Sequence, residues 1–429
     1  MEARFSSPAQ RWMFLCGIVL VTAVVMLFSV KIVVADYYAG KETPEGLARA
    51  VSLEPGNARD LYLLAHYWHY SLERRDLGLA VTYYHRALTL DPRSAKIWMD
   101  LGAAYEESGD LGQAREAYAE ALKSYPISAD VAWRYGNFLL RQREFPNAFA
   151  NIRRAVESDS KLAPAAISTC WRANPDIEMI LDRALPPSRS VYLDSIRFLA
   201  DQRSDDAALA VWKRLVGIKP KLELSDAFHL INELVQQDRI ADAKHVWREA
   251  LDRSGVSPSN ESPGSVMWDG GFKSAFVSGG FGWRKTEAPG VRFDFDQEIR
   301  HSGVHSLRIT FDGRENLGFN HLVQYVPVDP DTTYEFSAYL RTEDISTNSG
   351  LRFLISDSRN PAINQPTQQL TGTQPWTRVA LSLTTGPKTH LVTVALRRFP
   401  SEKLDNKLSG TVWVDDVALK PMEQKRSAR

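Results

Sequence analysis

The clearest pattern of apolar and polar positions lies in residues 95–128, where two helical stripes follow one another. Trp98, Leu101 and Tyr105 recur at the three- and four-residue spacing that puts side chains on one face of a helix. A second stripe follows after turn-forming residues 108–110, and its small side chains let two helix axes approach closely. It consists of Ala114, Tyr118 and Ala121. The pattern predicts a helix–turn–helix unit.

The spacing in this unit resembles the tetratricopeptide repeat (TPR), a 34-residue unit with characteristic side chains at fixed positions. Those positions are all matched, by Trp98, Leu101, Gly102, Tyr105, Ala114, Tyr118, Ala121 and Pro126. Weaker copies lie on both sides and give about five full and two partial units between residues 42 and 255. Because such units cannot bury their apolar faces alone, the resemblance implies an all-α solenoid with a concave binding surface.

The first helix of each unit supplies the side chains that we expect on this concave surface. They are Tyr62, His66, Met99, Trp133 and Asn137. Tyr62, Met99 and Trp133 stand where a clamp for a terminal carboxylate would need lysine. We therefore predict an aromatic groove that binds an extended segment or a helix of a partner protein. Packing of these aromatic side chains between neighbouring repeats is the alternative, and the sequence leaves it open.

Helical periodicity ends near Gly255, and residues 256–264 have the Ser, Pro and Gly content of a linker. Beyond it, short alternating runs separated by turn residues are typical of an antiparallel β-sandwich. In residues 334–341, for example, Tyr334, Phe336, Ala338 and Leu340 alternate with polar neighbours and should face a core. The predicted strands are 306–311, 322–328, 333–342, 350–357, 376–383, 391–397 and 411–419.

Residues 265–421 resemble the jelly-roll carbohydrate-binding modules, which have a galactose-binding-like fold. The landmarks that carry this resemblance are residues 268–272, 281–284, 302–309 and 326–328, Trp376, and residues 412–417. The resemblance implies glycan binding on a strand face, and the outward candidates are Gln324, Tyr339, Arg341 and Arg352. Trp283, Trp376 and Trp413 belong to the framework landmarks, which favours core packing for them.

A structural calcium between the first strand and a carboxylate of the last is a second implication of this resemblance. Asp415 or Asp416 matches the carboxylate of the last strand. Lys273 stands where the first strand would supply its acidic ligand, so this sequence departs from the pattern at that position. Calcium is the only cofactor that the sequence suggests.

The N-terminus carries an uncharged apolar run from Trp12 to Val30. A helix of this length spans roughly 28 Å, close to the thickness of the hydrocarbon core of a bilayer. Arg4 and Arg11 precede the run, which favours a cytoplasmic segment at residues 1–11 and a transmembrane anchor at residues 12–34. A cleaved signal peptide and a buried soluble helix are the alternatives. The expected location is the cytoplasmic (inner) membrane, with the body exported to the periplasm or cell exterior.

The net charge, the cysteines and the sequence motifs bear on which partners and chemistry the chain could have. Lys+Arg and Asp+Glu both number 52, so no net charge favours a nucleic-acid partner. Cys16 lies in the apolar run and Cys170 in the repeats, which makes a disulfide between them implausible. Neither a phosphate-binding loop nor a nucleophile elbow is present in the sequence, and His66 and His69 lack further ligands at metal-binding spacing.

These patterns predict a multidomain protein with an N-terminal transmembrane helix, an all-α TPR solenoid and a C-terminal antiparallel β-sandwich of the jelly-roll type. We expect a non-enzymatic adaptor whose solenoid binds a partner protein and whose sandwich contacts a glycan or a second protein, in the assembly or export of an envelope polysaccharide. The alternative is a glycan-active enzyme or a glycan-binding protein that works through the sandwich, with Asp416 as the residue to test. A purely structural sandwich is the third hypothesis.

Overall fold

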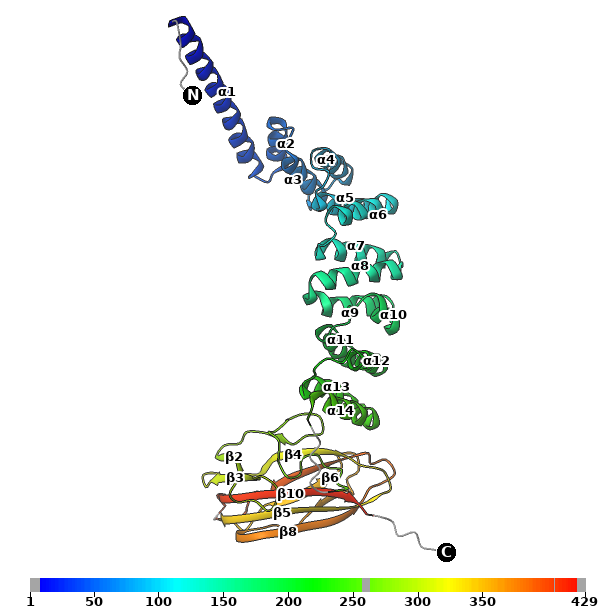
Figure 1. The fold of residues 1–429 in the computed structure, drawn as a ribbon, viewed down its shortest axis with the longest axis vertical. Helices are drawn as coiled ribbons and strands as arrows, with labels where there is room; N and C mark the ends of the chain where they lie inside the picture. The colour runs from blue at the N-terminus through cyan, green and yellow to red at the C-terminus, as the bar shows by residue number, and fades with distance from the viewer. Residues whose placement is uncertain (1–7, 257–262, 405, 423–429) are drawn as a thin grey trace. The chain divides into compact units, whose positions relative to one another are not determined.

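The structure, a computed structural model, describes residues 8–256, 263–404 and 406–422. Contacts between residues divide the chain into two compact units, Met1–Pro186 and Pro187–Arg429. The first unit contains α1–α10, and the second contains α11–α14 together with all the described strands (Figure 1). Most of the predicted linker, at residues 257–262, and residues 1–7 of the predicted cytoplasmic segment lie outside the described residues.

Helix α1 (Pro8–Ala39) contains the predicted anchor. Among the described residues it is the one helix that is long and apolar enough to cross a membrane, judged by length and composition. Its apolar side chains are exposed over most of its length, whereas Ala35 and Ala39 near its end are buried. Ala39 belongs to the core that α1 shares with the first repeats, so the end of α1 packs on the helical array.

The helical array follows the predicted period. After α2, the described helices α3–α14 form successive pairs, and the short 3₁₀ turns Ser160–Leu162 and Leu224–Ala227 precede α9 and α13. The pairs are α3 and α4 (Ala58–Tyr70, Leu77–Leu90), α5 and α6 (Ala95–Ser108, Leu111–Ser124), and α7 and α8 (Ala129–Arg141, Phe145–Ser158). Then come α9 and α10 (Ala163–Ala173, Ile177–Arg183), α11 and α12 (Arg189–Asp201, Asp205–Gly217), and α13 and α14 (Phe228–Gln236, Ile240–Ser254), while α2 is Pro44–Leu53.

Local chemistry explains where these helices begin and end. Asp76, Asp110 and Ser128 each accept the amide of the residue three positions on and so cap the N-termini of α4, α6 and α7. Gly109 ends α5 in the left-handed conformation, with φ of 85°, which glycine adopts at little cost. A methyl group at Gly102 would lie 3.1 Å from the Tyr118 ring, which confirms that this glycine permits close helix approach.

The described strands form two antiparallel sheets of five strands each, with the orders β1-β4-β9-β6-β7 and β2-β3-β10-β5-β8. Every predicted strand is present with shifted ends, and β1, β2 and β7 are additional. The strands are β1 Arg284–Lys285, β2 Val291–Asp296, β3 Ser306–Asp312, β4 Phe319–Pro327, β5 Thr333–Ile345, β6 Arg352–Ser356, β7 Asn364–Pro366, β8 Gly372–Thr384, β9 Leu391–Arg398 and β10 Ser409–Pro421. The inward side chains of both sheets meet in one apolar core.

Alternation along β5 confirms the predicted inward face. Tyr334, Phe336, Ala338 and Leu340 are fully buried in the core between the sheets. Tyr339, between two of them, therefore points outward from the sheet β2-β3-β10-β5-β8 and is half-buried. This alternation positions the candidate glycan-binding side chains described below.

Candidate functional site

A polar network joins the first helices of three consecutive repeats. The hydroxyl of Tyr62 in α3 donates to Asp100 Oδ2 in α5 at 2.8 Å, and Arg134 Nη1 in α7 lies 3.5 Å from Asp100 Oδ1. The ammonium of Lys96 lies 4.7 Å from the centroid of the Tyr62 ring. Asp100 is buried, and these two partners satisfy both of its oxygens. The network therefore aligns α3, α5 and α7, and we call the surface of these three helices the first-helix face.

The structure separates the five predicted groove residues by exposure. Tyr62 and Met99 are buried, at 8% and 7% exposed, which favours the packing interpretation for these two. His66 is exposed, while Trp133 and Asn137 are half-buried on α7. His66 lies beside the ring of Tyr70, at 4.5 Å between centroids, and also lines a pocket of about 480 Å³ with Asp36 and Arg59. His66, Trp133 and Asn137 are thus the accessible members of the predicted groove.

His69, one turn further along α3, is fully buried. Its Nδ1 lies 3.2 Å from the Tyr84 hydroxyl, and its Nε2 lies 3.4 Å from the carboxylate of Glu107. Burial lowers the pKa of His69 to about 4, so the imidazole is neutral at pH 7. The burial of His69 and its contacts with Tyr84 and Glu107 favour a packing role.

Tyr339 and Arg341 lie two residues apart on the outward face of β5, where an aromatic cluster surrounds them. His301 stacks on the Tyr339 ring at 3.6 Å between centroids, with 16° between the planes, and the Trp376 ring meets His301 edge-on at 5.6 Å. The Arg341 guanidinium lies 5.5 Å from the Trp413 ring centroid. We call Tyr339, His301, Trp376 and Arg341 the sheet-face cluster. Flat apolar rings beside planar donors are suited to sugar binding.

Sequence reasoning missed His301 as a member of this cluster and assigned Trp376 to the core. Trp376 is half-buried and does not belong to the core between the sheets, so that assignment is wrong. A shift in strand register between Leu340 and Thr342 of β5 interrupts the pairing with β8 beside Trp376. Strand irregularities of this kind are invisible to a two-residue pattern. Trp283 is buried in the core as expected, whereas Trp413 is buried under Arg341 on the outward side of β10, so the core assignment of Trp413 is also wrong.

Gln324 and Arg352 do not join the sheet-face cluster. The expectation that Gln324 faces outward is wrong, because its side chain is fully buried and its Nε2 donates to the Trp268 carbonyl at 2.7 Å. Gln324 lies in β4 between Leu322 and Val326, on the inward side of that strand. Arg352 lies in β6 of the other sheet, over the Phe399 ring.

The carboxylates of Asp415 and Asp416 hold the turn that carries His301. Asp415 Oδ2 accepts the amides of His301 and Ser302 at 2.9 and 3.0 Å. Asp416, in a bulge of β10 with φ of 47°, accepts the Ser302 hydroxyl at 2.6 Å and contacts His301 Nδ1 at 2.5 Å. Burial raises the pKa of Asp415, and the amides that bond to it act in the opposite direction.

No group of three His, Cys, Asp or Glu side chains that could hold a metal ion lies within the described residues. The carboxylates of Asp415 and Asp416 already accept the hydrogen bonds of the 301–302 turn. Calcium binding by these two residues stays a prediction.

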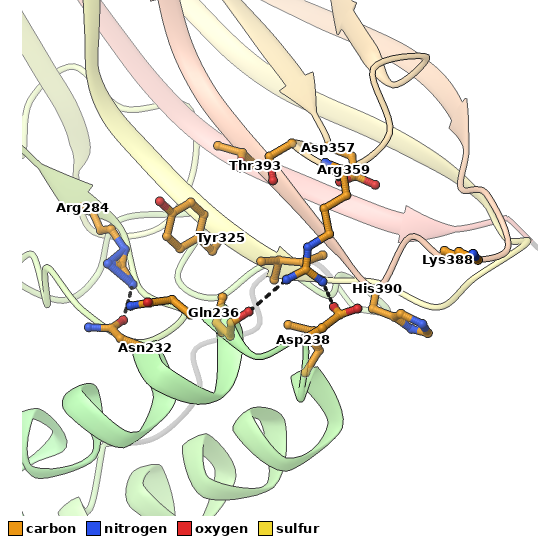
Figure 2. A pocket seen from close by; sticks show the side chains of 14 residues that line it. Asn232, Gln236, Asp238, Arg284, Tyr325, Asp357, Arg359, Lys388, His390 and Thr393 are labelled. Carbon is orange, nitrogen blue, oxygen red and sulfur yellow. Dashed lines mark hydrogen bonds and ion pairs between the residues drawn. The ribbon is translucent and has the colours of Figure 1, made fainter. Parts of the chain in front are cut away.

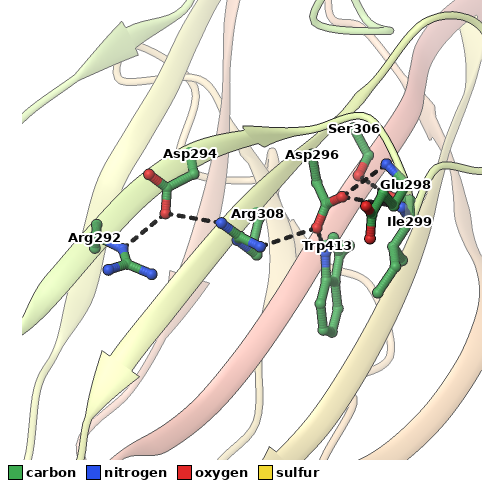
Figure 3. A network of polar contacts seen from close by, with 8 residues as sticks. All are labelled: Arg292, Asp294, Asp296, Glu298, Ile299, Ser306, Arg308 and Trp413. Atoms are coloured by element: carbon green, nitrogen blue, oxygen red, sulfur yellow. Dashed lines mark hydrogen bonds and ion pairs between the residues drawn. The ribbon is translucent and has the colours of Figure 1, made fainter.

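A second buried carboxylate stabilises the strands next to the sheet-face cluster (Figure 3). Asp296 Oδ2 accepts the indole N–H of Trp413 at 2.9 Å and lies 3.2 Å from Arg308 Nη1. Its Oδ1 accepts the amides of Glu298 and Ile299 at 3.0 Å. Burial would raise the pKa of Asp296, but these hydrogen bonds and the Arg308 charge outweigh it and lower the pKa. The hydrogen bond to Asp296 fixes the position of the Trp413 ring, over which the Arg341 guanidinium lies.

Comparison with known protein families identifies the repeats in part of the chain. Residues 71–132 and 104–163 each match a family model described as a tetratricopeptide repeat. Over 107 residues the chain is 30% identical to the general transcriptional corepressor ssn6 of Schizosaccharomyces pombe. This alignment covers 25% of the chain and 8% of the corepressor, so the chain spans less than a tenth of that relative.

Solved structures similar to the chain cover its two kinds of fold separately. YrrB, a TPR protein with an unusual peptide-binding site, is 17% identical, with a TM-score of 0.27, over 50% of this chain and 95% of its own. A family 16 carbohydrate-binding module is 15% identical, with a TM-score of 0.26, over 36% and 98%. The CBM22-1 xylan-binding domain of Paenibacillus barcinonensis Xyn10C is 18% identical, with a TM-score of 0.26, over 38% and 97%.

The chain therefore contains tetratricopeptide repeats, which match the family models over residues 71–163, and its described strands form a two-sheet β-sandwich. The two surfaces described above are the candidate binding sites of this chain.

Proposed function

We propose that this protein is a membrane-anchored, non-enzymatic scaffold that binds a partner protein through the first-helix face and a glycan through the sheet-face cluster. The observation that carries the proposal is the alignment of α3, α5 and α7 by the Tyr62–Asp100–Arg134 network, because it builds a continuous surface out of separate repeats. His66 and Trp133 remain accessible on this surface. A rigid face with accessible aromatic side chains suits an extended segment or helix of the partner.

The glycan part of the proposal rests on Tyr339, Trp376, His301 and Arg341, which offer rings and a planar cation from neighbouring strands and a turn. The apolar helix α1 supports the anchor, because its length and composition suit a membrane span. With the anchor in the cytoplasmic membrane, the body acts in the periplasm or cell exterior. A protein-binding array joined to a glycan-binding module suits the assembly or export of an envelope polysaccharide.

Site-specific photo-crosslinking in native membranes tests the protein-binding surface. A photoreactive amino acid is placed at His66 or Trp133 of the full chain, or at Glu116, an exposed residue of the second helix α6. We expect one discrete adduct band from the first two positions and none from Glu116. Equal crosslinking at all three positions, or none at any, would contradict a specific groove.

Retention of the full chain on immobilised envelope polysaccharide tests the glycan surface. Tyr339→Ala and Arg341→Ala should each weaken retention about tenfold, because a stacked ring or a charged hydrogen bond is lost. Arg352→Ala is the matched control, since Arg352 also lies over an aromatic ring but in the other sheet. If Arg352→Ala lowers retention as much as Tyr339→Ala, the sheet-face cluster is not the site.

One observation favours a second candidate, a glycan-active enzyme that works through the sandwich. His301 Nδ1 lies 2.5 Å from Asp416 Oδ2, which is the contact of a paired acid and base. If this pair is catalytic, the unchanged protein should hydrolyse a polysaccharide and Asp416→Asn should abolish this hydrolysis. If the pair only supports the turn, neither the unchanged protein nor Asp416→Asn should form product above background. We favour support of the turn, because Asp416 also accepts the Ser302 hydroxyl.

A further inference from the structure

The last helix pair packs directly on the sandwich within the second compact unit. The Trp247 ring of α14 meets Trp268 and Phe281 at 5.9 and 6.0 Å between centroids. Gly279 and Gly280 allow this approach, because a methyl group there would lie 2.1 Å from Phe228 and 2.4 Å from Trp247. The helices and the sandwich therefore share a packed interface, and side chains from both can build one site.

A pocket of about 460 Å³ lies at the edge of this interface (Figure 2). From the helices it receives Asn232 and Gln236 of α13 and Asp238 of the following turn. From the sandwich it receives Tyr325 on β4, Arg284 on β1, and Lys388 and His390 before β9. Tyr325 points outward from the sheet β1-β4-β9-β6-β7, so this pocket belongs to the opposite sheet from the sheet-face cluster.

Arg284 lies at one end of the pocket (Figure 2). Its guanidinium lies 4.6 Å from the Tyr325 ring centroid and donates to Asn232 Oδ1 at 3.2 Å and to the Gly280 carbonyl at 2.7 Å. Its Nε is buried and has no partner among the described residues. Both of its acceptors are neutral, so burial lowers the pKa of Arg284 with no anion to compensate the lost hydration.

The acidic side chains of the pocket already have partners within the protein. Asp238 forms an ion pair with Arg359. Asp357 accepts the Arg359 amide and the Thr389 hydroxyl, both at 2.8 Å. Among the described residues Lys388 and His390 have no side-chain partner, and Figure 2 shows them at the other end of the pocket from Arg284. Within the described part of the chain, Lys388 and His390 thus leave their side-chain nitrogens free at that end of the pocket.

We propose that this composite pocket binds an acidic sugar residue of a glycan, with the carboxylate of the sugar at Arg284 and its hydroxyls at the amides of Asn232 and Gln236. A guanidinium without a counter-ion favours a carboxylate, and Arg284 Nη1 is the nitrogen left to donate to it, because Nη2 already donates to Asn232 and Gly280. Amide groups and an aromatic ring are the usual complement of a sugar ring. Lys388 extends the positive lining toward a second acidic residue of the same glycan, and His390 lies beside it.

This inference goes beyond the proposed scaffold, because it requires the last repeat and the sandwich to act as one receptor. It also places a second glycan contact on the sheet opposite Tyr339. A ligand seated there contacts α13 and the sandwich together.

Titration of the full-length chain in detergent with sodium D-glucuronate and D-galacturonate, followed by ligand-observed NMR, tests the pocket. D-glucose and D-galactose are the matched neutral probes, and inorganic phosphate tests whether the oxyanion alone suffices. We expect the uronates to bind at least about tenfold more tightly than the neutral sugars or phosphate. Arg284→Gln should weaken uronate binding about tenfold, and Lys388→Ala about threefold.

Arg352→Gln is the matched control, because it removes a guanidinium from an aromatic ring of the same sheet outside the pocket, and it should leave affinity within about twofold. Equal affinity for neutral sugars, unchanged binding in folded Arg284→Gln, or phosphate binding as tightly as uronate would each overturn the proposal. If Arg284→Gln does not fold, the double variant Lys388→Ala/His390→Gln replaces it. Weaker uronate binding by this double variant would then support the proposal, and unchanged binding would overturn it. Tyr339→Ala should leave uronate binding intact, so failure of the sheet-face cluster is distinguishable from failure here.

Discussion

The repeats and the sandwich bring their polar partners together over different distances along the chain. In the repeats, Tyr62 bonds to Asp100 across 38 residues and Arg141 bonds to Glu106 across 35. In the sandwich, Trp413 bonds to Asp296 across 117 residues. A repeat therefore depends on its neighbour, whereas the sandwich depends on strands from its two ends. Because the repeats recur at a fixed period, the contacts between them can be predicted from the sequence. The sandwich has no such period.

Gly270→Ala should cause the largest loss of stability, because it disrupts a close contact between distant segments of the sandwich. A methyl group at Gly270 would lie 1.8 Å from the Val417 carbonyl oxygen, and backbone there cannot move aside cheaply. We expect a loss of about 3 kcal/mol in the free energy of unfolding, measured by urea denaturation of the full chain.

The matched change in the repeats is Gly102→Ala, where the nearest atoms belong to a Tyr118 side chain at 3.1 Å. It should cost less than about 1 kcal/mol, since the gain in helix propensity offsets part of the crowding. If Gly102→Ala destabilises the protein as much as Gly270→Ala, the repeats are no more tolerant than the sandwich.

Acidification should weaken the first repeat selectively. The pKa of His69 is about 4 in the native protein and near 6.5 in the unfolded chain. Between these two pH values the unfolded chain binds a proton at His69 and the native protein does not. Stability is therefore lost as pH falls below about 6.5, by about 2 kcal/mol at pH 5. Hydrogen exchange of α3 and α4 amides at pH 7 and 5 measures this loss.

His69→Gln removes the titrating group and should make the exchange of α3 and α4 independent of pH in this range after correction for intrinsic rates. His85, which is exposed and contacts the Tyr105 hydroxyl, provides the control His85→Gln. A pH response that persists in His69→Gln would assign the effect to another group.

Asp296→Asn should cost about 1.5 kcal/mol, because the charged acceptor of Trp413 and Arg308 is lost. The pKa of Asp296 is lowered in the native protein, so its contribution is complete above the usual carboxyl pKa near 4. It declines as pH falls through the lower native value. Near-UV circular dichroism during urea unfolding at pH 7 and pH 3 should show a smaller acid loss in the variant.

The half-exposed Asp294, which pairs with Arg292 and Arg308, provides the control Asp294→Asn. This substitution should cost less than Asp296→Asn, because solvent screens its ion pairs. An equal cost for both would show that burial of Asp296 adds nothing.

Cys170→Ala should lower the free energy of unfolding only slightly, by about 1 kcal/mol, because it trims a small buried side chain in α9. In the native chain, burial raises the pKa of Cys170 to about 12, so this thiol should resist maleimide until urea is added. The same chain unfolded in urea serves as the reactive comparison. Rapid labelling of Cys170 would mean that the weakly patterned repeats are loosely packed.

The repeat array and the strands could be predicted from the sequence because both leave local patterns. Ala114, Tyr118 and Ala121 recur at the helical spacing and are all buried, and Tyr334 to Leu340 alternate as the strand requires. The local pattern also predicted that Tyr339 and Arg341 share the outward face of one strand. It could not show that Tyr62 and Met99 are buried by neighbouring repeats, because the depth of a groove depends on how helices stack.

Only the tertiary structure decided which distant residues meet. It placed His301 on Tyr339 and carried Trp376 out of the core. It turned Gln324 inward toward Trp268, and it brought α13 against Arg284 to form the composite pocket. The physical reason is that side-chain spacing along one segment determines which face of a helix or strand is apolar, whereas contacts between segments depend on strand order, bulges and close packing at glycines such as Gly279.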